Sequence, residues 1–458
     1  MDIAGLFLNG VDFIMRESAL FAATGFLILG LGDLAVDLVW LACRARRLGR
    51  PSFALESLPA PVGPGLLAIF VPAWDEAAVI GDMLRGAVRA WGEGDWRIYV
   101  GTYRNDPATA AAAAAVAAVE SRVRVVTGAA PGPTTKADCL NRLWLAMLAD
   151  EGHERRRAKA VVLHDAEDVV HPAEIAVFDS LMERFELVQL PVLPLIDPNS
   201  RWLGGHYADE FAESHGKEMV VRGALGAGLP SAGVGCAFSR SALGDLAAKR
   251  GGLPFDADSL TEDYELGLRL AEMGARRAFV RIRAAGRLVA TREFFPGTLA
   301  ASVRQKARWT TGIALSGWDR LGWSGGLAER WMRLRDRQSL LAAILLGAGY
   351  LALACWLALK ARQGAGGPGP SPLPRPLSVL LSVNLGLLGW RATVRAGFTT
   401  AAYGWREGLR SVPRMAIGNL VSMLAAAAAL SRYQALRRGG PPRWDKTAHI
   451  FPALAASE

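Results

Sequence analysis

The segment 160–172 constrains the fold most, because it joins a short apolar run to a cluster of acids. The run Ala-Val-Val-Leu is apolar and partly β-branched, which is typical of a buried strand in a parallel sheet. Asp165, Glu167 and Asp168 follow within four positions, and Pro172 suits the first turn of a helix. In open α/β sheets, ligands bind beyond the carboxyl ends of the strands, where these acids are expected.

Three clustered carboxylates repel one another unless a cation or a basic ligand neutralises them. Oxygen ligands suit Mg²⁺ or Mn²⁺, which in turn bridge phosphate oxygens. The alternative is a solvated acidic turn that opens a helix and is favoured by the helix dipole. Both interpretations stay open on this segment alone.

The composition indicates a soluble domain joined to a few membrane segments. The chain has 458 residues, 51% of them hydrophobic, and a net charge of +9. Arginines cluster beside two apolar runs, as in the positive-inside pattern of membrane proteins, and no nucleic-acid-binding motif accompanies the charge. The clustered arginines are Arg44, Arg46, Arg47, Arg50, Arg330, Arg333, Arg335 and Arg337.

Residues 1–50 are expected to hold one membrane helix, at about 19–42, and its basic flank. The run is long enough to cross a bilayer at roughly 1.5 Å per residue. The flank places the following domain in the cytoplasm and the N-terminus outside. Asp33 and Asp37 lie one helical turn apart and share a face. They either line a cavity or sit near the membrane edge.

Residues 321–400 are expected to form an amphipathic linker and two further membrane helices, at about 339–359 and 377–394. The last of these has a short apolar run, so Arg391 would have to snorkel to the membrane surface. Residues 401–458 are expected to form an interfacial helix and a basic tail that stays in the cytoplasm.

The region between these membrane segments, residues 60–320, alternates short apolar runs with helical patterns. This rhythm predicts a doubly wound α/β sheet of mostly parallel strands. The expected strands are Leu66–Val71, Arg97–Thr102, Arg122–Thr127, Ala160–His164 and Leu187–Val192.

Loops after the first strands carry candidate ligand-binding side chains. Trp74 and Glu76 follow the first strand, where an aromatic ring can stack on a base. Asp106 follows the second strand and can offer a carboxylate to a base. Lys136 opens a later helix, where its ammonium group can meet a phosphate. Each loop is also an ordinary surface turn when taken alone.

The segment Thr261-Glu262-Asp263 begins an apolar-periodic helix. Thr261 as the N-cap residue explains the local sequence without any function. The functional interpretation makes Asp263 the general base that removes a proton from an acceptor hydroxyl.

Gln305, Arg308 and Trp309 fall on one helical face. The guanidinium group can neutralise a pyrophosphate, and the indole can stack on a sugar ring. The alternative is an amphipathic helix that lies along the membrane.

The order of these motifs, flanked by membrane helices, resembles that of the processive family 2 glycosyltransferases, which include cellulose, chitin and hyaluronan synthases. A closer resemblance is to the bacteriophage N4 adsorption protein B family of inner-membrane glycosyltransferases. The segments that carry the closer resemblance are 33–37, 135–141, 164–172 and 444–447.

The resemblance implies a GT-A fold, with a Rossmann-like nucleotide-sugar domain and flanking membrane and interfacial helices. It implies a nucleotide-diphosphate sugar, expected to be UDP-linked, with Mg²⁺ or Mn²⁺ held by Asp165 and Glu167. Glu167 replaces the second Asp of the DxD motif, which leaves Asp168 as a further candidate ligand. Asp263 matches the catalytic base, with Glu262 beside it.

By the same resemblance, Gln305, Arg308 and Trp309 bind the acceptor end of the site, and Gly235 belongs to an acceptor-gate loop. Asp106 stands where the family has one of two acids that hold uracil, but Asn105 replaces the other acid.

The implied function is an inverting hexosyltransferase of a bacterial inner membrane that extends a β-linked exopolysaccharide. Two or three membrane spans are few for enclosing a glycan, so secretion is expected to need an oligomer or an outer-membrane or periplasmic partner. The alternatives are a transferase that adds one sugar to a lipid carrier, and a phage-receptor or secretion scaffold on a transferase fold.

Overall fold

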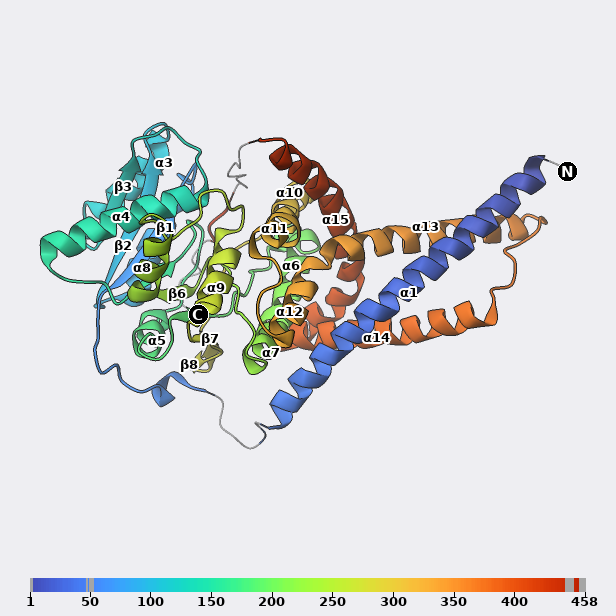
Figure 1. The fold of residues 1–458 in the computed structure, drawn as a ribbon, viewed down its shortest axis with the longest axis horizontal. Coiled ribbons are helices and arrows are strands. Elements are labelled where there is room, and N and C mark those ends of the chain that lie inside the picture. Colours follow the sequence, from blue (N-terminus) through green and yellow to red (C-terminus); the bar gives the residue numbers. More distant parts are fainter. Residues whose placement is uncertain (1–2, 47, 49–52, 441–448, 453–458) are drawn as a thin grey trace.

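A mixed sheet of seven strands, in the order β3-β2-β1-β4-β6-β5-β7, forms the centre of the larger part of the molecule (Figure 1). The computed structural model describes residues 3–46, 48, 53–440 and 449–452. The strands are β1 (Leu67–Pro72), β2 (Trp96–Tyr103), β3 (Val123–Gly128), β4 (Ala160–Leu163), β5 (Leu187–Gln189), β6 (Cys236–Ser239) and β7 (Arg277–Phe279).

The first four of these strands are parallel, which confirms the predicted doubly wound arrangement. β6 is antiparallel to both of its neighbours and was not predicted. The predicted strand at Leu187–Val192 is too long, because β5 ends at Gln189, and Pro191 has no main-chain N–H with which to continue the ladder. A separate two-stranded ribbon joins β8 (Arg283–Ala284) to β9 (Arg287–Leu288).

Helices cover both faces of the sheet, which explains why its central strands β1 and β4 are apolar and buried throughout. Along β1, Ile69 belongs to the core beneath α2, α3 and α5, and its neighbour Phe70 belongs to the core beneath α4, α8 and α9. Successive side chains of a strand point to opposite faces, so both sets of positions are buried. These helices are α2 (Ile80–Trp91), α3 (Pro107–Ala117), α4 (Lys136–Glu154), α5 (Glu174–Leu181), α8 (Arg240–Lys249) and α9 (Glu262–Glu272).

Helices α1 (Ile3–Ala45), α13 (Ser339–Gly364) and α14 (Arg375–Tyr403) project from this domain, with the N-terminus at their far end (Figure 1). With α15 (Trp405–Arg437), they are the four helices long and apolar enough to cross a membrane in the described part of the chain. α14 is longer than predicted. The Arg391 side chain pairs with Asp33 of α1, and its expected reach to the membrane surface stays a prediction.

α15 lies against the α/β domain beside α6 (Leu203–Glu213) and α10 (Leu299–Thr310) (Figure 1). Its buried Arg414 binds Asp209 of α6 at 3.1 Å and also pairs with Glu407. Its interfacial placement stays a prediction, since its length and composition also suit a span.

Short helices and two π-helical turns connect the domain to the projecting helices. They are α7 (Met219–Ala224), α11 (Gly317–Leu321), α12 (Leu327–Arg337) and the π-helical turns Ser214–Glu218 and Thr311–Ser316.

The acid pair of α1 holds this connection. Asp37 binds Lys217 of the first π-helical turn at 2.6 Å and accepts a hydrogen bond from the Trp390 indole at 2.8 Å. Asp33 binds Arg335 of α12 at 2.9 Å. Both acids therefore join α1 to other elements.

Candidate active site

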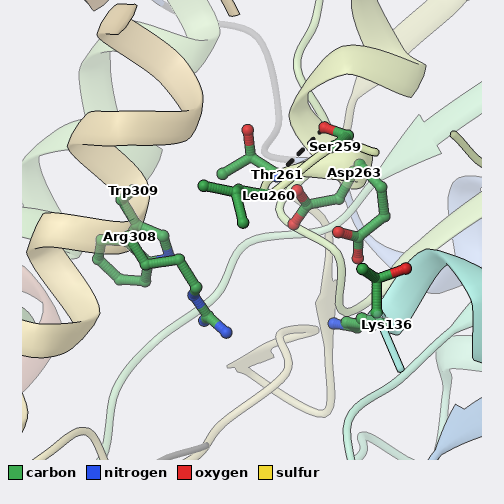
Figure 2. Close-up of a pocket in the computed structure, with 9 residues that line it drawn as sticks. Lys136, Ser259, Leu260, Thr261, Asp263, Arg308 and Trp309 are labelled. Carbon is green, nitrogen blue, oxygen red and sulfur yellow. Dashed lines mark hydrogen bonds between the residues drawn. The ribbon is translucent and has the colours of Figure 1, made fainter. Parts of the chain in front are cut away.

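Three helix ends meet at a pocket beyond the carboxyl ends of the parallel strands. α4 contributes its first residue, α9 its first turn and α10 its last turn (Figure 2). The pocket is lined by Thr135, Lys136, Ser259, Leu260, Thr261, Glu262, Asp263, Arg308 and Trp309. Residues predicted from three separate motifs are therefore brought together.

Lys136 is the central cation of the pocket. Its ammonium group lies 2.6 Å from Asp165, which follows β4. Burial alone would lower the pKa of Lys136, but the carboxylates of Asp165, Glu262 and Asp263 raise it. Lys136 therefore stays charged, at the place where a phosphate is expected.

Glu262 and Asp263 stand in the first turn of α9, beside Lys136. Burial raises the pKa of both carboxyl groups, that of Glu262 to about 7. A base whose pKa rises toward the working pH accepts a proton more readily, which suits Asp263 for its predicted role. Thr261 occupies the N-cap position, but its hydroxyl makes no capping bond and is buried without a partner in the described structure. Capping therefore does not account for this segment.

The predicted gate loop lies directly against Asp263. Gly233 has φ +76°, and a Cβ atom at this position would collide with the Asp263 carboxylate. Gly235 has φ +55°, and the Gln189 amide donates to its carbonyl and to that of Val234. Only glycine adopts this conformation without strain, so the loop needs glycine for its close approach to the candidate base.

Asp168 is not among the residues that line the pocket. Its carboxylate binds Nδ1 of His164 at 2.7 Å, and Nε2 of His164 binds Glu174 at 2.6 Å. Burial alone would lower the pKa of His164, but Glu174 and Asp168 raise it to about 10. Asp168 also accepts a hydrogen bond from the main chain of Asp165, so it shapes the acidic turn. Its role as a metal ligand stays a prediction.

Glu167 meets two residues that are distant in sequence. His449 lies 3.1 Å from Glu167 through Nε2 and 2.9 Å from Glu76 through Nδ1. One ligand atom from each of the three residues lies within 4.8 Å of the others. Two carboxylates and an imidazole form a donor set that fits Mn²⁺ or a similar divalent cation.

Sequence analysis missed His449 and Glu293. Burial, followed by the charges of Asp168, Glu167 and Asp165, raises the pKa of Glu293 well above its ordinary value, so this residue faces the same acids. The segment 444–447, which carried part of the family resemblance, lies outside the described residues. It ends two positions before His449 and was the signal that pointed to this part of the chain.

The residues that were predicted to bind the nucleotide base make contacts with neighbouring loops of the protein. Trp74 packs edge-on against Tyr103 with ring centroids 5.2 Å apart. Asp106 accepts hydrogen bonds from the main-chain nitrogens of Asp75, at 2.6 Å, and Thr109, at 3.3 Å. The Asn105 side chain bonds the main chain of the loop that opens toward α4. Contact of these residues with a nucleotide stays a prediction.

Of the three predicted residues of α10, Arg308 and Trp309 line the pocket and Gln305 does not. Figure 2 shows the Arg308 guanidinium group pointing toward Lys136. Trp309 also lines the pocket and packs against Tyr207. Gln305 is not among the lining residues, and its Oε1 atom is buried without a hydrogen bond in the described structure.

The chain is similar to known glycosyltransferases and to two curated bacterial proteins. The family model "Glycosyltransferase like family 2" matches residues 64–312. Bacteriophage adsorption protein B of Escherichia coli strain K12 is 36% identical over 99% of this chain and 64% of its own length. Bacteriophage N4 adsorption protein B of Escherichia coli O157:H7 matches to the same extent. The chain thus spans just under two thirds of the length of these curated relatives.

A solved structure shares the fold. The mannosyltransferase PcManGT from Pyrobaculum calidifontis, solved in complex with GDP-Man and Mn²⁺, superposes with a TM-score of 0.53 and 17% sequence identity. The match covers 89% of this chain and 99% of the mannosyltransferase. The predicted GT-A fold is therefore confirmed. The extent of the family match and the identity to adsorption protein B show that the chain belongs to the family 2 glycosyltransferases.

Proposed function

We propose that this protein is an inverting, metal-dependent hexosyltransferase of a bacterial inner membrane. It transfers sugar from a UDP-linked donor to a growing β-linked exopolysaccharide. The observation that carries this proposal is the pocket in which Asp263 faces the Lys136–Asp165 pair, with Arg308 and Trp309 on its other wall.

In this proposal, Asp263 takes the proton of the acceptor hydroxyl. The acceptor oxygen attacks the anomeric carbon opposite the diphosphate, the bond from that carbon to the diphosphate breaks, and the configuration inverts. Lys136 and Arg308 supply positive charge to the departing diphosphate. Charges that are already fixed in place need little rearrangement as the reaction proceeds. Trp309 offers its ring to an acceptor sugar.

A Mg²⁺ or Mn²⁺ ion fits the acids beside this pocket. Asp165 and Glu167 would hold it, with Glu76 and His449 as the further donors that surround Glu167. When bound, the ion would neutralise charge on the leaving diphosphate. The relation to PcManGT, whose structure contains Mn²⁺, agrees with this choice of cation.

The membrane location rests on the projecting helices. In the proposed orientation the catalytic domain is cytoplasmic and the N-terminus is outside. The relatives carry the name of phage adsorption proteins, so a receptor or secretion scaffold is the second candidate function. Export of the glycan would require an oligomer or an outer-membrane or periplasmic partner.

The test is release of nucleotide diphosphate by membranes that contain the protein, over a panel of UDP- and GDP-sugars with Mg²⁺ or Mn²⁺. We expect turnover with one donor and its loss in Asp165→Ala. Product length on a gel then separates a polymer from a single sugar on a lipid carrier. Absence of turnover with every donor, with a glycan acceptor present, would favour the scaffold.

A further inference from the structure

A second, larger hollow of about 2410 Å³ lies between the α/β domain and the projecting helices. One wall is apolar and comes from α1 and α14, including Trp40, Val394 and Phe398. The opposite wall comes from the segment 277–292, which carries β7 and the β8–β9 ribbon. The hollow is larger than the roughly 300–1,000 Å³ of common small-molecule pockets.

Positive charge dominates this hollow. Its described lining contains eight arginines and one lysine but only two acids, Asp37 and Glu56. Asp37 is already bound to Lys217 at 2.6 Å. The arginines therefore greatly outnumber the carboxylates available to them.

Individual arginines of the hollow bind main-chain carbonyl groups instead of carboxylates. Arg281 donates to the His215 carbonyl at 2.7 Å, and Arg283 donates to the Gly286 carbonyl at 2.7 Å. Neither makes an ion pair with a carboxylate in the described part of the chain, and the same holds for Arg44. Arg281 is exposed to the hollow, where partial desolvation, followed by the charges of Arg283 and Arg44, lowers its pKa. Arg44, Arg281 and Arg283 are exposed, and like charges gathered in this way attract an anion.

The hollow and the candidate active site lie on two sides of one extended segment. The main chain of Arg292 pairs with that of Val169, directly after the acidic turn. Arg292 lines the hollow, whereas the next residue, Glu293, faces the acids of the site. Neighbouring side chains of an extended segment point to opposite sides. A ligand in the hollow would thus contact the segment that holds Glu293.

We propose that this hollow binds an anionic phospholipid of the surrounding bilayer. The phosphate group meets Arg44, Arg281 and Arg283, and the acyl chains lie along the apolar wall of α1 and α14. Basic pockets beside membrane helices are suited to such headgroups. The proposal rests on the membrane location proposed above but not on transferase activity.

The test is native mass spectrometry of the purified full chain, with bound lipids counted after addition of phosphatidylglycerol, phosphatidylcholine or a polyprenyl phosphate. We expect phosphatidylglycerol to remain bound in preference to the other two. Its apparent affinity should fall at least tenfold in the double variant Arg281→Gln/Arg283→Gln. Arg44→Gln should also weaken phosphatidylglycerol binding, and this single variant is the test if the double variant does not fold.

The matched control is Arg85→Gln/Arg89→Gln, which removes two exposed charges from α2, outside the hollow. It should leave binding unchanged. Equal retention of phosphatidylcholine, or undiminished phosphatidylglycerol binding in the hollow variants, would overturn the proposal. Preferential binding of the polyprenyl phosphate would also overturn it and would assign the hollow to a lipid-carrier substrate. Because lipid is counted directly, the result does not depend on whether a sugar donor is turned over.

Discussion

Buried acids occur in two regions of this molecule and are compensated differently. Where α1 and α14 meet the domain, Asp37 and Glu213 both bind Lys217, and Glu213 also binds Arg395 at 2.8 Å. Acids and bases are balanced there. In the candidate active site, several carboxylates surround the single ammonium group of Lys136.

The difference separates charges that hold the structure from charges that bind ligands. A balanced buried network stabilises one arrangement of helices and has no surplus charge to offer. The site keeps a surplus of carboxylates, which suits a divalent cation and a transferable proton. The hollow on the other side of the segment 291–294 has a surplus of arginines, which suits an anion.

The largest stability effect should come from breaking the balanced network. Lys217→Met leaves Asp37 and Glu213 with fewer cations in a buried place, and we expect the free energy of unfolding to fall by about 3–5 kcal/mol. Thermal or denaturant unfolding of the purified protein measures it. Lys249→Met, at an exposed position of α8, is the matched control. Equal losses in the two variants would show that the network does not hold the helices.

A smaller, site-specific effect should follow Gly233→Ala. The new methyl group would collide with Asp263 on a backbone that already has a positive φ. We expect a loss of kcat of about 10–100-fold with donor affinity retained, because the displaced group is the candidate base. Gly152→Ala, where nothing lies within 4 Å of the new atom, should be neutral. A fall in donor affinity with unchanged kcat would remove the loop from the chemical step.

The smallest effect is expected at a second balanced pair, between α6 and α10. Glu210 binds Lys306 at 2.7 Å. Burial alone would raise the pKa of Glu210, but Lys306 and then His206 lower it to about 2. A lowered pKa means that the pair stabilises the fold above the unfolded-state pKa of about 4.5, and that this contribution disappears as the pH falls toward 2.

Glu210→Gln should therefore lower the free energy of unfolding at pH 6 by about 1–2 kcal/mol, and by less at pH 3. Unfolding curves of both proteins at the two pH values measure the difference. Glu93→Gln, at an exposed position after α2, is the control. A difference that grows at pH 3 would contradict the assigned sign.

Features that depend on residues close together in the sequence could be predicted. The strands read from apolar runs are present, and Lys136, Glu262 and Asp263 meet as their strand-end and helix-start positions implied. A parallel sheet brings its carboxyl ends to one edge, so local patterns were sufficient to place these residues together.

Contacts between distant segments were not predictable in this way. His449 reaches Glu76 across 373 positions of sequence. Asp33 of α1 pairs with Arg391 of α14, a contact that neither local segment indicates. Asp168 was predicted as a metal ligand together with its neighbours, and its bond to the buried His164 was not foreseen. In each case the partner, rather than the local pattern, determines the environment of the side chain.

The most direct test of the proposed chemistry compares turnover and donor binding in Asp263→Asn, with Asp258→Asn, an exposed residue of the preceding loop, as the control. Nucleotide-diphosphate release and donor affinity are measured on the same folded protein. If Asp263 is the base, release falls by about 10³-fold or more, whereas donor affinity stays within a few-fold of that of the unmodified protein. Release at an undiminished rate in Asp263→Asn would contradict the assignment of this pocket as the catalytic site.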